Sequence, residues 1–196
     1  ALLLVIIFES PHRSSLPPSR GKAGIRCTAA SAMFASAALE ERLAAKGQGK
    51  WETALKLYRD IESQFPSDPR AATAVLRKAE VLTKLGKRAE AIKCYEQILK
   101  SPSWRGEAYA EALYRLGLIA QHNKQRDKAL MYFDRCYLGY ANCYNWTGKA
   151  LLSAAKLLAT GGEIDKAKEV CDEFLGNKLN EQSPDFAEIK QYRKTL

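Results

Sequence analysis

Cysteine and histidine are the side chains in this sequence best suited to act as nucleophiles, bases or metal ligands. The 196-residue chain has five cysteines and two histidines. No two cysteines have the CxxC spacing of a zinc or thiol–disulfide site, so we predict no metal ligand set and no redox pair. We expect Cys136 and Cys171 to be buried and unpaired, and Cys94 to be partly exposed. The remaining two are Cys27 and Cys143.

The common enzyme motifs are absent from the sequence. It contains no GxGxxG, GxxxxGK[ST], HExxH or GxSxG segment. His12 lies in the N-terminal region, and His122 stands beside Asn123 at an expected helix end, where an imidazole can cap free carbonyl groups. We therefore predict a non-catalytic protein without a catalytic residue, a cofactor or a bound metal.

The composition is that of a folded globular protein with a basic excess. Hydrophobic residues make up 46% of the chain, charged residues 27%, and the formal net charge is +9. Lysine and arginine alternate with acidic residues and never form a run longer than two, and the positive excess falls toward the C-terminus. Because nucleic-acid binding proteins usually gather their basic residues in one stripe, we expect no nucleic-acid partner.

The N-terminal region differs from the rest of the chain. Residues 1–8 are all apolar, which is too short for a membrane span of about 20 residues. Residues 9–32 contain three prolines and a single acid. Residues 1–32 are therefore expected to be a leader or disordered segment, and residues 33–196 the folded domain. The leader is open to three interpretations: a truncated export signal, an organelle transit sequence, or upstream sequence that is not natively translated before Met33.

An alanine recurs every 37 or 38 residues through most of the chain. These anchor alanines are Ala54, Ala91, Ala129 and Ala167. Bulky or sulphur-containing side chains follow each of them by four and seven residues, which places all three positions on one face of a helix. Each anchor is predicted to begin the second helix of a two-helix unit, and Pro66 and Pro102 mark the ends of the first two units.

Small residues mark two further positions of each unit. Five residues before the anchors stand Gly49, Gly86 and Gly162, with Lys124 in the third unit, where we predict a left-handed turn residue between two helices. Twelve residues before the last three anchors, small residues are expected to let two helix backbones approach closely. These are Ala79, Gly117 and Ala155.

This order of a small residue, a glycine, an alanine, an aromatic residue and a proline resembles the tetratricopeptide repeat (TPR). Residues 71–102 are the most regular example, and the resemblance covers about residues 35–177. It implies an all-α, right-handed α-solenoid of about four helix-turn-helix repeats with a C-terminal capping helix near Pro184. The units exceed the usual length of about 34 residues. In this they are similar to bacterial envelope repeat proteins, which favours a bacterial envelope, periplasm or cytoplasm and leaves organelle import as an alternative.

The resemblance also implies a function. Proteins of this family hold other polypeptides on the concave surface that the first helices of the units form. We therefore expect a scaffold or adaptor that binds a protein or peptide segment, with no membrane span. The expected exposed, partner-binding positions are Thr73, Leu76, Glu80, Glu111, Tyr114, Leu118, Gln121, Lys149, Leu152 and Lys156.

Several alternatives remain open on sequence alone. The chain could be a structural fragment of a longer repeat array, or an accessory or regulatory subunit of an enzyme or organelle complex. The carboxylate clamp of chaperone-binding family members is missing, because Leu76, Glu80 and Tyr114 stand at matching positions. The aromatic segment 136–146 suits either a recognition patch or packing of the turn between the third and fourth units.

Overall fold

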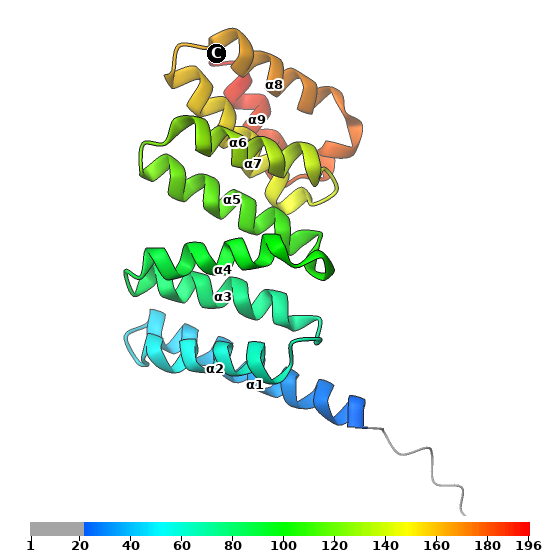
Figure 1. Cartoon of the computed structure of the whole chain (residues 1–196). Helices are drawn as coiled ribbons and strands as arrows, with labels where there is room; N and C mark the ends of the chain where they lie inside the picture. The colour runs from blue at the N-terminus through cyan, green and yellow to red at the C-terminus, as the bar shows by residue number, and fades with distance from the viewer. Residues whose placement is uncertain (1–21) are drawn as a thin grey trace, which may run out of the picture.

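The described part of the chain is a stack of helices without a β-strand. The computed structural model describes residues 22–196, and their side chains from residue 29 onward. The helices are α1 (Lys22–Ala45), α2 (Trp51–Gln64), α3 (Arg70–Lys84), α4 (Arg88–Lys100), α5 (Glu107–His122), α6 (Arg126–Gly139), α7 (Tyr144–Thr160), α8 (Ile164–Gly176) and α9 (Phe186–Arg193), with short 3-10 helices η1 (Pro102–Trp104) and η2 (Lys178–Gln182). The predicted all-α solenoid with a C-terminal helix is confirmed (Figure 1).

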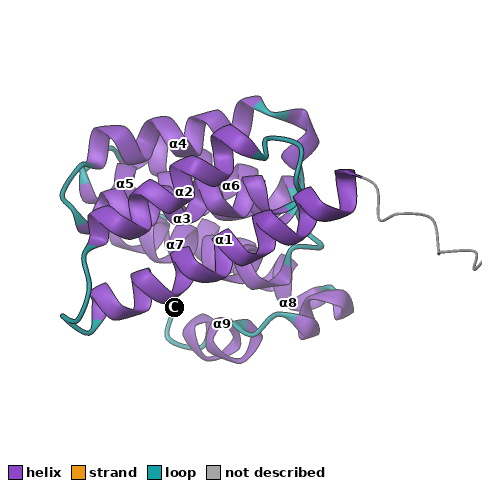
Figure 2. Ribbon diagram, turned by 90° about the horizontal axis from the view of Figure 1, so that it is seen from below, coloured by secondary structure: helices purple, strands orange, loops and turns teal. Residues whose placement is uncertain are grey.

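The eight longer helices form four pairs that stack in chain order (Figure 1). Each of α1, α3, α5 and α7 contacts the next member of this set, whereas α2, α4, α6 and α8 make few or no contacts with one another. By these contacts the first set forms the inner layer and the second set the outer layer. Short loops join consecutive helices (Figure 2). Helix α9 packs against α8 and α7 at the end of the stack.

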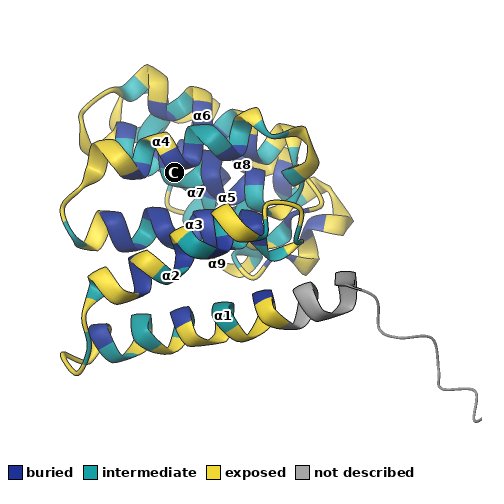
Figure 3. Ribbon diagram, turned by 60° about the horizontal axis from the view of Figure 1, so that its bottom comes forward, coloured by how far each residue is buried: buried dark blue, intermediate teal, exposed yellow. Residues whose placement is uncertain are grey.

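The core lies between the two layers (Figure 3). All four anchor alanines are fully buried, as are Tyr58, Ile98 and Phe133 on the same helix faces. The predicted core face of each outer helix is thus confirmed, because the positions zero, four and seven residues from each anchor point inward. In the described residues, no helix has the length and apolarity to cross a membrane.

Helix α1 begins at Lys22, well before the expected start of the domain at Met33. Ala30 and Ala37 are buried on it, so the helix already packs within the segment expected to be loose. Residues 1–21, with His12, lie outside the described residues, and so does the side chain of Cys27.

The turns within the units share one backbone conformation. Gly86 (φ 74°), Gly162 (φ 84°) and Lys124 (φ 57°) all have the left-handed conformation predicted for this position. In the first unit the prediction for Gly49 is wrong, because Gly47 (φ 73°) turns the chain there instead. Gly49 is constrained by packing, since a Cβ atom on it would lie 2.9 Å from the Cβ of Leu43.

The small residues of the inner helices allow the close approach that their spacing predicted. A Cβ atom on Gly117 of α5 would lie 2.4 Å from the Phe133 ring of α6, which is well inside van der Waals contact. Ala79 and Ala155, at the equivalent positions, are fully buried. The ring of Phe133 therefore occupies the volume that any other residue at 117 would need.

Four cysteine side chains are described, and all are buried and free. The predictions for Cys136 and Cys171 are confirmed. The prediction for Cys94 is wrong: the residue is 6% exposed, because it packs in the core beside Lys78, which forms an ion pair with Glu62 across helices α3 and α2. Burial raises the pKa of all four thiols, that of Cys136 to about 12.

The turn conformation predicts that Lys124→Gly stabilises the protein. A side chain in the left-handed region costs about 1 kcal/mol that glycine avoids, which exceeds the loss in chain entropy. We expect a gain of about 0.5 kcal/mol in the free energy of unfolding, measured by urea denaturation. The control is Lys93→Gly, an exposed position within α4, which should lose about 1 kcal/mol. An equal loss of unfolding free energy in Lys124→Gly and Lys93→Gly would show that Lys124 does not have the left-handed conformation.

The contact with Phe133 predicts that Gly117→Ala destabilises the protein. Overpacking should cost about 1–3 kcal/mol, against about 1 kcal/mol returned by the better helix propensity of alanine. The control is Gly139→Ala at the end of α6, where an added Cβ has no atom within 4 Å and stability should hold or rise. Adding Phe133→Leu to Gly117→Ala should relieve part of the overlap. A fully additive loss in the double variant would show that the two residues do not compete for space.

Thiol burial predicts slow labelling of the native protein. With Cys27 replaced by serine, the four described cysteines should react with a disulfide reagent at pH 8 at least about a hundredfold more slowly than in urea. Because burial raises the pKa of each thiol, only a small fraction of each is thiolate at pH 8, which slows native labelling further. Fast modification of Cys136 or Cys171, mapped by mass spectrometry, would contradict the packing described above.

Candidate interaction surface

All ten predicted partner-binding residues lie on the inner helices α3, α5 and α7. Gln121 and Lys156 are exposed, and five more are half-buried: Thr73, Glu80, Tyr114, Leu118 and Lys149. The expectation of exposure is wrong for the other three, which are buried: Leu76, Glu111 and Leu152. Neighbouring inner helices approach closely enough to contact one another, so each covers the flank of the next and only a narrow strip stays accessible.

The strip is hollowed where α1, α3 and α5 meet. This inner hollow has a volume of about 350 Å³. Its lining combines apolar and charged side chains: Glu41, Glu80, Thr83, Lys84, Tyr95, Arg115, Leu118 and Ile119. Of the predicted positions it brings together Glu80 and Leu118. Glu41 and Arg115 were not predicted, because the first unit departs from the repeat pattern and Arg115 lies on the side of α5 that faces α3.

Ion pairs across α3 and α5 fix the charged side of the inner hollow. Glu80 accepts hydrogen bonds from Arg77 (2.6 Å) and from Arg115, which also donates to Glu111 (3.2 Å). Burial and the neighbouring Glu80 raise the pKa of the Glu111 carboxyl, while Arg115 opposes that shift. The network joins the second and third units and holds Glu80 and Arg115 in place before any partner arrives.

Glu41 forms the opposite wall of the inner hollow. Its carboxylate accepts a hydrogen bond from the hydroxyl of the fully buried Tyr58 (2.8 Å). Burial, followed by this bond, raises the pKa of Tyr58 above its ordinary value, so the phenol stays protonated and keeps donating. A core tyrosine of α2 thereby orients a carboxylate on the inner surface.

Aromatic and cationic side chains continue the surface from α5 to α7. The Tyr114 ring lies 6.1 Å from that of Phe133 and 5.8 Å from that of Trp146. Arg115 and Lys149 lie 5.5 and 4.8 Å from the Trp146 ring centre, within the range of cation–π attraction. Tyr114 is therefore partly a packing residue, and its exposed edge is the part available to a partner.

The aromatic segment 136–146 contributes mainly to packing. Tyr140 packs against Tyr109, with ring centres 5.8 Å apart, and Trp146 packs against Tyr114. Tyr137 instead faces a separate hollow between α6 and α8. Among residues whose side chains are described, no group of three His, Cys, Asp or Glu side chains is placed to hold a metal ion.

Comparisons with known proteins agree with this architecture. Residues 39–92 and 76–138 match the family described as tetratricopeptide repeat, so the matches together span just over half of the chain. No curated protein matches the sequence. Among solved structures, similar folds include a putative kinesin light chain with nearly identical TPR-like repeats from Podosopora anserina (TM-score 0.54, 14% identity, 85% of this chain and 88% of that one). Another is MamA (TM-score 0.51, 18% identity, 79% of this chain and 90% of that one).

At these identities the two structures establish the shared fold alone. The sequence match and the stacked helix pairs point to one conclusion. The chain belongs to the tetratricopeptide repeat family, whose repeats generally mediate interactions between proteins.

Proposed function

We propose that this chain is a non-catalytic scaffold or adaptor that binds a peptide or protein segment along the inner face of α1, α3, α5 and α7. The observation that carries the proposal is the inner hollow of about 350 Å³ on that face. Proteins of this family typically serve as scaffolds and not as enzymes, and they bind proteins or peptides.

The inner hollow suits a side chain that is apolar at its tip and flanked by polar backbone. Tyr95, Leu118 and Ile119 supply apolar surface, while Glu41, Glu80 and Arg115 supply hydrogen-bonding groups around it. Ion pairs already hold the side chains of Glu80 and Arg115 in place. Partner binding therefore costs little conformational entropy for ordering these two side chains. Charges of both signs favour a partner with both signs over a purely acidic or basic one.

The predicted residues divide into two roles. Thr73, Glu80, Leu118, Gln121, Lys149 and Lys156 are proposed to contact the partner through their exposed surface, together with the edge of Tyr114. Leu76, Glu111 and Leu152 are proposed to support these contacts from beneath, since they are buried under the same strip. Binding energy should therefore concentrate around Leu118, where the surface is both apolar and hollowed.

The proposal predicts that Leu118→Ala weakens partner binding. A partner purified from the native source by affinity capture should bind this variant at least about tenfold more weakly by calorimetry, because truncation removes apolar contact from the floor of the inner hollow. The melting temperature should change little, since Leu118 is only half-buried. Tyr114→Ala is expected to lose both affinity and stability, because Tyr114 also packs against Phe133 and Trp146.

The matched control is Met131→Ala. Met131 is an exposed apolar residue on α6, in the outer layer, and its truncation should leave affinity unchanged. Full affinity in Leu118→Ala, or an equal loss in both variants, would exclude the inner face as the binding surface.

A further inference from the structure

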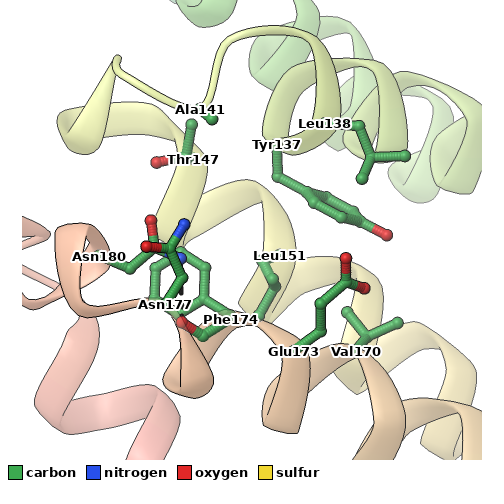
Figure 4. A pocket seen from close by; sticks show the side chains of 10 residues that line it. All are labelled: Tyr137, Leu138, Ala141, Thr147, Leu151, Val170, Glu173, Phe174, Asn177 and Asn180. Atoms are coloured by element: carbon green, nitrogen blue, oxygen red, sulfur yellow. Dashed lines mark hydrogen bonds between the residues drawn. The ribbon is translucent and has the colours of Figure 1, made fainter.

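A second hollow, of about 320 Å³, opens in the outer layer between α6 and α8 (Figure 4). We call it the outer hollow. Its walls are Tyr137 and Leu138 of α6 and Val170, Glu173 and Phe174 of α8, and Thr147 of α7 lies at its base. It shares no lining residue with the inner hollow.

A difference between two successive repeats explains why the outer hollow is open. Tyr109 stands 38 residues before Thr147, at the same position of the preceding repeat. Its ring packs against Tyr140 at 5.8 Å, and its hydroxyl donates to the carbonyl oxygen of Leu99 on α4 (3.0 Å). The phenol thus fills the space beside α4. Threonine is too short to span the equivalent gap to Tyr137, which is the counterpart of Leu99.

Thr147 carries a hydroxyl without a partner. The residue is 1% exposed, and no described atom forms a hydrogen bond with its Oγ1. Leaving a buried hydroxyl unpaired costs about 1–3 kcal/mol relative to a paired one. The Thr147 oxygen is itself closed off from solvent, so this residue contributes to the outer hollow by its small size and not as a hydrogen-bonding group.

The mouth of the outer hollow is acidic. The Glu173 carboxylate faces the Tyr137 hydroxyl (Figure 4), and Glu173 has no ion pair among the described residues. Burial, followed by the nearby carboxylates of Asp134 and Glu173, raises the pKa of the Tyr137 phenol, whose hydroxyl is hydrogen-bonded to Asp134. No cationic side chain lines the outer hollow, so an entering group meets negative charge at the rim and, inside, apolar side chains together with the amides of Asn177 and Asn180.

Apolar surface extends beyond the outer hollow itself. Leu138 at its rim is 63% exposed, and Leu179 of the adjacent helix η2 is also exposed. A small molecule that filled the hollow would leave these two leucines in water. A polypeptide segment that inserts one side chain would cover them with its neighbouring residues.

We propose that the outer hollow is a second docking site, which takes a partner segment that inserts one apolar side chain and places a lysine or arginine against Glu173. The site goes beyond the inner-face function proposed above and does not depend on it, because the two surfaces belong to different layers.

A phage-displayed library of random dodecapeptides, selected on the full chain, tests the proposal. Peptides that bind the full chain but not a Thr147→Tyr variant should be recovered, and they should pair a leucine, methionine or phenylalanine with an adjacent lysine or arginine. The tyrosine restores the filling residue of the preceding repeat, so it closes the hollow with a side chain that the fold already accepts at that position.

Synthetic versions of the recovered peptides give the quantitative test. Their affinity should fall at least about tenfold in Thr147→Tyr and in Glu173→Lys. It should stay within about twofold in Glu52→Lys, an exposed position on α2 with the same charge change. Leu138→Ala, which removes an exposed apolar side chain at the rim of the outer hollow, should weaken binding severalfold while the melting temperature changes little. That variant keeps the test informative if Thr147→Tyr does not fold.

Three outcomes would overturn the proposal. One is that no peptide distinguishes the full chain from Thr147→Tyr. The second is that the recovered peptides bind Glu173→Lys at full strength. The third is that their binding is lost in Leu118→Ala and kept in Thr147→Tyr and Leu138→Ala, which assigns them to the inner face. That last result would support the inner-face function while excluding this second site, so the two proposals fail separately.

Discussion

The close packing of each inner helix against the outer helix of its own unit is the contact on which the rest of this solenoid depends. It is tightest where Gly117 receives the ring of Phe133, and Ala79 and Ala155 hold the equivalent positions. Because these residues have little or no side chain, the inner helices can sit deep enough to touch their neighbours in adjacent units. The outer helices then lie farther apart than the inner ones. The packing within each unit thus determines both how much of the inner strip is accessible and how widely the outer helices are spaced.

The two layers offer different chemistry as a consequence. Inner helices lie close together, so charged side chains such as Glu80 and Arg115 meet across units and lock one another. Outer helices lie farther apart, and although side-chain contacts such as Arg59–Glu90 join α2 and α4, much of the space between them is filled from the helix beneath. Tyr109 fills it in one repeat and Thr147 does not in the next. Ion pairs between units therefore shape the inner hollow, whereas the size of one side chain opens the outer hollow.

Much of the fold could be predicted because its determinants recur. The anchor alanines and the small residues Gly117 and Ala155 repeat at a nearly constant spacing, and Lys124 keeps the left-handed turn conformation although it is not a glycine. The burial of Leu76 and Cys94 could not be predicted, because it depends on how closely a neighbouring helix approaches. Glu41 escaped prediction because it stands in the first unit, where the repeat pattern is broken.

Positions like Thr147 show how a repeat protein can acquire a site without changing its fold. Replacing a gap-filling phenol with threonine removes buried contacts and leaves a hydroxyl unpaired, and both effects destabilise the folded chain. The neighbouring repeat contacts tolerate the loss, because stability in a solenoid is a sum over units and their interfaces and not the property of one central core. Sites of this kind should be sought at repeat positions where one unit has a smaller residue than the other units, while the residues around that position follow the repeat pattern.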